Sequence, residues 1–486
     1  MTNFPSAIFK IGLVASLGVL SACAVPDLGP RPQPRVANDV AAARSLPAGT
    51  AAWPREDWWS AYADPQLSRL IDQALVASPD VAAAAARFAR AQGLAQQAGA
   101  ATLPRIDGQA SATMQRQSLN NGFPEEFKTV VPRGWNDAAA ASVSLSFDLD
   151  LWGRNRAALA AATSDADAAG IDMAQARLML TTGIANAYAD LARLHAQRDI
   201  AQSAYVIRAS TRRLVDDRVR TGLDTRGDLR QAEAGLSSAQ AELAAADEAI
   251  ALRRNQIAAL VGAGPDLGLD MGRPVLADRF GTDLPADVDT NLIGRRPDVA
   301  SARARVEAAA SRIKVARADF FPALNLSALI GVQSLGVDLI AQRDSLYGNA
   351  GPAISLPIFR GGALAGQYRG ARGGYDEAVA SYDRTVIDAY REVADAVTSR
   401  NALVQRVAFA RSALAKSEEA YAIARKRYEG GLSTFLDVLV VEERLLDARR
   451  AVAELDMRGF ALDISLIRAL GGGFVSPAPS KDSSHG

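Results

Sequence analysis

The chain has 486 residues, and its 54 basic residues balance its 54 acidic ones, so its formal net charge is zero. It lacks the basic surplus that nucleic-acid binding requires, and we expect no nucleic acid among its partners. One cysteine and two histidines exclude both a disulfide framework and a metal site built from cysteine and histidine.

The first predicted element is an export signal. Lys10 precedes an apolar run from Ile11 to Leu20, which is too short to span a bilayer and is typical of a signal-peptide core. Leu20 and the three residues after it, Ser-Ala-Cys, match the cleavage pattern of bacterial lipoproteins and place the only cysteine, Cys23, at the lipidated position. An ordinary signal peptide with an incidental cysteine is the alternative. By analogy with bacterial lipoproteins, Ala24 after the cysteine favours the outer membrane.

Beyond a linker predicted over 23–60, the chain contains one unit twice. The sequence Ser-Pro-Asp-Val at 78–81 recurs as Arg-Pro-Asp-Val at 296–299. Residues 218–236 align with 427–445, with matching glycine, threonine, aspartate and glutamate positions. Chance similarity between alanine-rich helices would not keep these landmarks in order, so we predict an internal duplication.

Each unit is predicted to contain a helix, two strands and two long helices. A signal peptide is predicted at 1–22, a connecting segment between the units at 266–290 and a disordered tail at 474–486. The first unit spans 61–265, with strands at about 104–117 and 141–152 and long helices at about 154–220 and 224–260. The second unit spans 291–473, with strands at about 323–334 and 350–359 and long helices at about 361–429 and 433–470.

The long helices have coiled-coil spacing. In the first, Leu180, Ile184, Ala187, Leu191 and Leu194 alternate between steps of four and three residues. The long helix of the second unit continues the same spacing from Val379 onward. At 1.5 Å per residue the first helix would reach roughly 100 Å, so we expect helices packed side by side over a great length.

The strands are predicted from alternation of polar and apolar residues. Polar and apolar residues alternate strictly from Ser142 to Leu151, nearly so from Arg105 to Gln115, and less regularly in the two later strands. Segments of about ten alternating residues are typical of membrane β-barrels, although a soluble strand over a core has the same pattern. Four strands cannot close a barrel in lipid, so either they are soluble hairpins or several chains contribute four each. In a barrel, five side chains of the first stretch would face lipid: Val143, Leu145, Phe147, Leu149 and Leu151.

Three segments, Trp58 to Leu75, Asp150 to Arg154 and Arg295 to Val306, resemble the TolC-like outer-membrane efflux channels, most closely their NodT-type lipoprotein branch. The resemblance implies a mainly α fold with a small β part. It also implies a homotrimer whose chains each give four strands to one twelve-stranded outer-membrane barrel, joined to a long periplasmic barrel of helices. The implied function is a passive channel that exports small molecules such as drugs or toxic compounds. The implied partners are a periplasmic adaptor, an inner-membrane pump and outer-membrane lipid.

The resemblance also implies where the channel closes. In the family the turns between the long helices form the periplasmic end and receive the adaptor. Here they correspond to Gly222, Leu223, Gly430, Gly431 and Leu432.

Three further residues correspond to the family's gate. Asp228 and Asp437 match its acids, and Tyr428 matches a tyrosine that would hydrogen-bond Asp228. The alternatives are a helix-start acid at Asp437, favoured by the helix dipole, and a packing role for Tyr428. Ser433 and Val440 replace an arginine and a second aspartate of some members, so we expect other contacts to hold the closed state.

We predict no enzymatic activity and no cofactor or metal. His195 has no nucleophile motif around it, and the glycine runs lack the strand-to-helix context of a phosphate loop. The adjacent acids Glu442 and Glu443 point to different helix faces and predict a solvated surface. A periplasmic coiled-coil adaptor or scaffold lipoprotein is the first alternative to a channel, and a cell-envelope enzyme is the second.

Overall fold

The structure is a computed structural model that describes residues 25–46, 49–120, 124–276 and 284–476. Cys23 and the predicted signal peptide lie outside these residues. Within them, no helix combines the length and the apolar character needed to cross a membrane. The chain divides into two compact units, the first including 89–167 and 304–380, and the second including 168–303 and 381–486. Each unit therefore draws on both sequence repeats.

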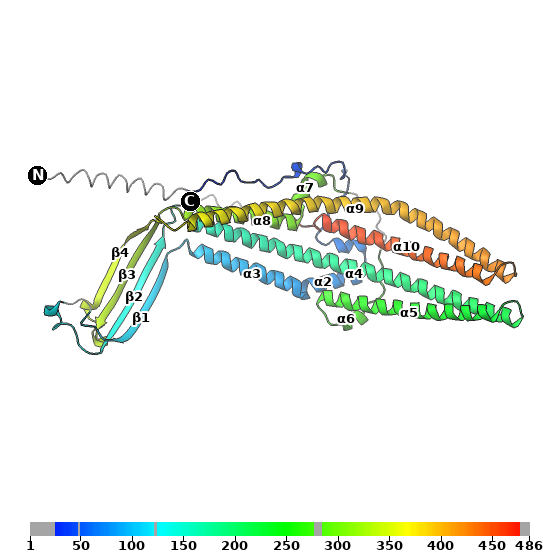
Figure 1. Ribbon diagram of the computed structural model, residues 1–486, viewed down its shortest axis with the longest axis horizontal. Coiled ribbons are helices and arrows are strands. Elements are labelled where there is room, and N and C mark those ends of the chain that lie inside the picture. Colours follow the sequence, from blue (N-terminus) through cyan, green and yellow to red (C-terminus); the bar gives the residue numbers. More distant parts are fainter. Residues whose placement is uncertain (1–24, 47–48, 121–123, 277–283, 477–486) are drawn as a thin grey trace. The chain divides into compact units, whose positions relative to one another are not determined.

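The first unit contains one antiparallel sheet in the order β1-β2-β3-β4 (Figure 1). The strands are β1 (Arg105–Gln115), β2 (Asn136–Asp148), β3 (Ala323–Leu335) and β4 (Leu346–Ser355). The first repeat supplies β1 and β2 and the second supplies β3 and β4, so the repeats join through the β2–β3 pairing. Among the described residues, β1 and β4 each pair with one strand only, and each leaves an open edge.

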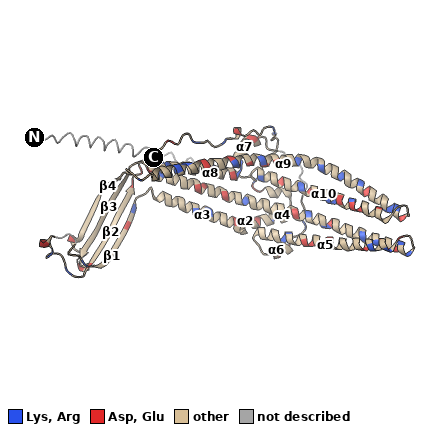
Figure 2. Ribbon diagram, in the orientation of Figure 1, with Lys and Arg blue, Asp and Glu red and all other residues tan. Residues whose placement is uncertain are grey.

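One face of the sheet is apolar and uncovered. The register aligns Gly108, Val143, Ile330 and Gly348 across the four strands, and the next row along this face is also apolar. Val143 is 50% exposed and Ile330 61% exposed, whereas large apolar side chains over a soluble core are buried. Figure 2 shows few charged residues on the strands and many along the helices. This face has the character of a surface that meets lipid.

The strand prediction through Trp152 extends beyond the observed strand, because β2 ends at Asp148. Asp150 has a φ of 44°, and its carboxylate accepts hydrogen bonds from the backbone N–H groups of Asn155 and Arg156, both at 2.9 Å. These bonds satisfy free N–H groups at the start of the following helix. The alternating pattern therefore continues into the strand-to-helix turn, where the structure places Leu149 and Leu151.

Helices make up most of the rest of the chain. They are α2 (Pro65–Ala77), α3 (Pro79–Ala100), α4 (Arg154–Arg220), α5 (Arg226–Val261), α6 (Asp266–Leu269), α7 (Val288–Arg295), α8 (Pro297–Ala318), α9 (Ala363–Glu429) and α10 (Phe435–Ala469). Short 3-10 helices span Ala37–Asp39, Trp58–Tyr62, Glu125–Phe127, Val337–Leu339 and Arg343–Ser345. The long helices α4 and α9 have 67 residues each and hold equivalent places in the two repeats. The predicted class, mainly α with a small β part and a duplicated unit, is confirmed.

The hydrophobic core of the second unit includes residues of α2, α4, α5 and α10. Leu180, Ile184, Ala187 and Leu191, four of the residues predicted to form a coiled-coil seam, are all buried in it. Burial of this stripe is what holds a long, otherwise polar helix in place, since isolated helices in water are only marginally stable. The packing positions the two helical hairpins, α4–α5 and α9–α10, whose turns form the candidate site.

Candidate functional site: the turns of the two helical hairpins

The turns that end α4 and α9 have the same backbone geometry. In the first, Gly222 has a φ of 79°, and the N–H of Leu223 donates to the carbonyl oxygen of Arg218 at 2.8 Å. In the second, Gly431 has a φ of 73°, and the N–H of Leu432 makes the equivalent 2.8 Å bond. Such bonds satisfy the last carbonyl groups of a helix, and left-handed φ favours glycine.

The two leucines at the turns are exposed. Leu223 is 66% exposed and Leu432 is 72% exposed. Gly430, the other glycine predicted in the second turn, is not in the left-handed region, so Gly431 alone makes that reversal. Each turn thus presents one large apolar side chain to its surroundings.

The predicted gate acids both begin a helix. The Asp228 carboxylate accepts from the backbone N–H of Thr225 at 3.0 Å and from its hydroxyl at 2.7 Å, while the Thr225 hydroxyl oxygen accepts from the Asp228 N–H. Asp437 and Thr434 form the same reciprocal capping box on α10. Bonds from Thr225 and Thr434 hold the pKa of Asp228 and Asp437, respectively, below the ordinary value of 3.8.

A cluster of three residues, Arg218, Asp224 and Tyr428, connects the two hairpins; we call it the turn cluster. The Asp224 carboxylate accepts from Arg218 Nε at 2.9 Å and Nη2 at 3.3 Å, and the Tyr428 hydroxyl also donates to it. Arg218 Nη1 donates to the Tyr428 carbonyl oxygen at 3.0 Å, and its guanidinium lies 4.5 Å from the centre of the Tyr428 ring. One side chain of α9 is therefore held by two residues of the other hairpin.

Burial makes these contacts strong. Tyr428 is 1% exposed and packs with Val215, Phe435 and Val438. Burial, followed by the hydrogen bond to Asp224, raises the pKa of Tyr428, so it remains a neutral donor near neutral pH. Hydrogen bonds that involve a charged group and exclude water are worth more than neutral, solvated ones.

The predicted hydrogen bond from Tyr428 goes to Asp224 and not to Asp228. The Asp228 carboxylate is occupied by Thr225, whereas Asp224 lies in the turn itself, where it meets the neighbouring hairpin. Sequence reasoning missed Asp224 and its partner Arg218. The alignment of the two repeats contains a signal that points to Asp224. Asp224 aligns with Ser433, so this position is ionisable in only one copy, which indicates that the two copies differ in role there.

A second charged cluster joins α4, α5 and α10. Arg208 donates to Glu442 and to Glu443, at 3.2 Å each, and to the carbonyl oxygen of Gly235 at 3.3 Å. Glu443 is exposed as predicted, but Glu442 is 1% exposed, so the prediction of a solvated surface is wrong for Glu442. The apolar residues around it on α10 turn its helix face inward, which adjacency in sequence does not reveal.

The described part of the chain contains no group of three or more histidine, cysteine or acidic residues that could hold a metal ion. His195 is partly buried, and burial, together with the charge of Arg254, lowers its pKa. It is therefore a neutral imidazole at neutral pH, and Nε2 has no hydrogen-bond partner among the described residues. The ordered polar contacts of the site hold helices together.

Comparison with known proteins gives a consistent result. The sequence profile of the family described as "Outer membrane efflux protein" matches residues 70–263 and 290–472, one segment in each repeat. The fusaric acid resistance protein FusA of Burkholderia cepacia is 34% identical over 367 residues, which cover 74% of this chain and 68% of FusA. The pyoverdine export outer membrane protein OpmQ of Pseudomonas aeruginosa is 29% identical over 476 residues, covering 96% of this chain and 97% of OpmQ.

Solved structures share the fold along most of the chain. The crystal structure of the outer membrane protein VceC of Vibrio cholerae is 44% identical, covers 87% of this chain and all of its own, and superposes with a TM-score of 0.81. The outer-membrane channel OprN is 26% identical, covers 94% of this chain and superposes with a TM-score of 0.82. The similarity therefore extends over both repeats and both compact units.

Proposed function

The chain belongs to the outer membrane efflux protein family, and we propose that its conduit is closed at the hairpin turns by the turn cluster of Arg218, Asp224 and Tyr428. As a member of this family it is an efflux channel of the outer membrane that extends into the periplasm, and it is not an enzyme. The predicted membership of the outer-membrane efflux channel family is thereby confirmed, and the adaptor or scaffold alternative is not favoured.

The proposed assembly is a homotrimer. Each chain has a four-stranded sheet with two open edges and an uncovered apolar face, and lipid does not tolerate open strand edges. Pairing β4 of one copy with β1 of the next removes every edge and gives twelve strands in three copies. In this arrangement the lipid on Cys23, which lies outside the described residues, would add a second membrane attachment.

The single observation that carries the gate is the contact between hairpins. Opening the narrow end of a helical conduit requires α9–α10 and α4–α5 to move apart at their turns. The turn cluster opposes that movement, because separation would break the Tyr428 hydroxyl bond, the Arg218 bond to the Tyr428 carbonyl and the guanidinium–ring contact. Asp228 and Asp437 would then line the narrow end as rings of acids, which favour cations.

The exposed leucines supply the proposed docking surface for the adaptor. Leu223 and Leu432, with the glycines beside them, form two similar apolar tips at the ends of the hairpins. Exposed apolar side chains on rigid turns are suited to burial by a partner protein. The cargo is a small molecule, and the pump and adaptor select it; related proteins carry names that refer to pyoverdine export, multidrug resistance and fusaric acid resistance.

Conductance across a planar lipid bilayer tests the proposal. The purified wild-type protein should give discrete channels of low conductance. Asp224→Asn combined with Tyr428→Phe should raise the mean conductance several-fold, because the two substitutions remove the charge and the hydroxyl that hold the hairpins together. Tyr205→Phe is the matched control, since it removes a tyrosine hydroxyl from α4 that has no hydrogen bond within the described structure.

The possible results separate the channel from its gate. Equal conductance in wild type and double variant would contradict the turn cluster as gate and leave the channel intact. No conductance in either protein would contradict the channel itself. An increase in the Tyr205→Phe control as large as that in the double variant would show that the effect does not depend on the cluster.

A further inference from the structure

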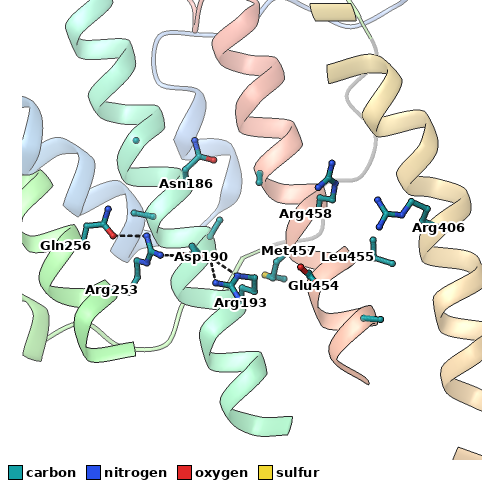
Figure 3. Close-up of a pocket in the computed structure, with 15 residues that line it drawn as sticks. Asn186, Asp190, Arg193, Arg253, Gln256, Arg406, Glu454, Leu455, Met457 and Arg458 are labelled. Carbon is teal, nitrogen blue, oxygen red and sulfur yellow. Dashed lines mark hydrogen bonds and ion pairs between the residues drawn. The ribbon is translucent and has the colours of Figure 1, made fainter. Parts of the chain in front are cut away.

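A cavity of about 610 Å³ lies among α4, α5, α9 and α10 in the second unit, away from the hairpin turns (Figure 3). Four arginines and two acids line it: Arg193, Arg253, Arg406, Arg458, Asp190 and Glu454. We call it the arginine pocket. Four positive side chains against two negative ones leave a surplus of two positive charges, although the whole chain is neutral.

The α4–α5 side of the arginine pocket is already ordered. Asp190 accepts from Arg193 Nε at 2.7 Å and pairs with Arg253, whose Nη1 donates to Gln256 at 2.7 Å. Each of these charged side chains is less than one-third exposed. One carboxylate therefore holds two guanidinium groups in place and neutralises only one of them.

The α9–α10 side supplies two further cations and one acid, Glu454 of α10. Arg406 of α9 and Arg458 of α10 face the space between their helices in Figure 3. Across the described residues, neither forms an ion pair or a hydrogen bond with a protein side chain, and both are exposed. Like charges brought to one cavity repel each other, and an anion bound between them would remove that repulsion.

We propose that the arginine pocket binds a small organic anion that carries two or three carboxylate or phosphate groups. Planar guanidinium groups bind both kinds of group through paired hydrogen bonds. A volume of about 610 Å³ suits a small molecule, since ligand sites usually measure about 300–1,000 Å³. Leu455 and Met457 provide apolar surface for the carbon body of the ligand.

The positions of the four arginines also indicate how a bound ligand would act on the helices. Its charged groups would contact Arg193 and Arg253 on one hairpin and Arg406 and Arg458 on the other, so one molecule would bridge α4–α5 and α9–α10. A divalent anion is the smallest species that matches the surplus charge of two. The inference goes beyond the proposed function and does not depend on the gate, because binding can be measured without transport.

Binding is tested on the full-length protein in detergent by isothermal titration calorimetry with citrate and, separately, with fructose 1,6-bisphosphate, at constant ionic strength. We expect saturable binding of at least one of them, weakened at least tenfold by Arg406→Gln combined with Arg458→Gln. The matched control is Arg384→Gln combined with Arg444→Gln, which also removes one exposed arginine from each of α9 and α10, outside the pocket. The control should bind as the wild type does.

The two ligands distinguish carboxylate from phosphate recognition, and either preference supports the proposal if the pocket variant loses it. Binding of neither anion by the wild type would overturn the proposal. Equal binding by wild type and pocket variant would also overturn it, since the anion would then bind elsewhere. Because all four substituted arginines are exposed, we expect both variants to fold, and circular dichroism of the helices checks this directly.

Discussion

Asp224 gives the turn of the first repeat a role that the turn of the second repeat does not have. Both turns share the glycine, the capping threonine and the helix-start aspartate, and both have an arginine four residues before the glycine. The first copy adds Asp224, which binds its arginine and Tyr428; the second has Ser433, whose buried hydroxyl finds no partner in the described structure. The contact between hairpins thus depends on the first copy supplying a carboxylate and the second a tyrosine.

Glu442 makes a testable prediction about pH. Burial raises the pKa of this carboxyl above its ordinary value of 4.5, and Arg208 opposes the rise only in part. The folded protein therefore binds this proton more tightly than the unfolded chain does, and its free energy of unfolding falls as pH rises from about 4.5 through the raised pKa. Glu442→Gln cannot ionise, so its stability relative to wild type should increase over the same range.

The measurement is the melting temperature of the helices followed by circular dichroism between pH 4.5 and 8. Glu443→Gln is the control, because the Glu443 side chain is 69% exposed and binds the same arginine. Its melting temperature should follow that of the wild type in parallel. A Glu442→Gln profile parallel to the wild type would show that the Glu442 carboxyl is not destabilised by its burial.

At the scale of elements, alanine substitutions of two glycines in adjacent strands should differ in their effect on stability. A Cβ added to Gly331 of β3 would lie 2.6 Å from the carbonyl oxygen of Ala141 and 2.8 Å from Cβ of Ser142, both in β2. The strands would have to shift, so Gly331→Ala should destabilise the sheet by about 1–3 kcal/mol. The added Cβ of Gly351→Ala in β4 meets no atom of the described residues within 4 Å, so this substitution should change stability by less than about 0.5 kcal/mol.

Urea unfolding in detergent, followed by the fraction of protein that migrates as the folded form before heating, compares the two variants. A lower urea midpoint for Gly331→Ala than for Gly351→Ala is expected. Equal midpoints would mean that the β2–β3 pairing, through which the two repeats join, can widen at Gly331 without cost.

The spacing of apolar residues predicted the helices and strands because each of these elements depends on a local sequence pattern. The seam residues of α4 are spaced for packing, and burial follows from that spacing. The same kind of pattern does not predict where β2 ends. The alternation of polar and apolar residues continues into the turn after β2, and Asp150 fixes that turn by accepting hydrogen bonds from the first N–H groups of α4. The turn cluster was equally hidden, because Asp224 and Tyr428 are far apart in sequence and meet only when the hairpins pack.

At the scale of the whole molecule, the sheet is incomplete within one chain. The two edge strands, β1 and β4, belong to different repeats, and across the part of the chain that the structure describes no further strand pairs with the outer edge of either. Further strands could come from another duplication within the chain. Association of identical chains also supplies further strands, without lengthening the chain. Cyclic pairing is the solution that leaves no edge, and head-to-tail contacts close into a ring when the rotation between copies allows it.

Cysteine cross-linking tests that ring. The sequence has one cysteine, Cys23, which we expect to be lipidated, so introduced thiols report their own contacts. Ala110→Cys in β1, combined with a cysteine at each position of β4 in turn, should give a ladder of one, two and three linked chains at the positions that pair. A ladder that stops at two or continues past three, or no cross-link at any position, would contradict the trimer. Ala141→Cys in β2 replaces the β1 cysteine as control and should give no links between chains, because β2 pairs on both sides within its own chain.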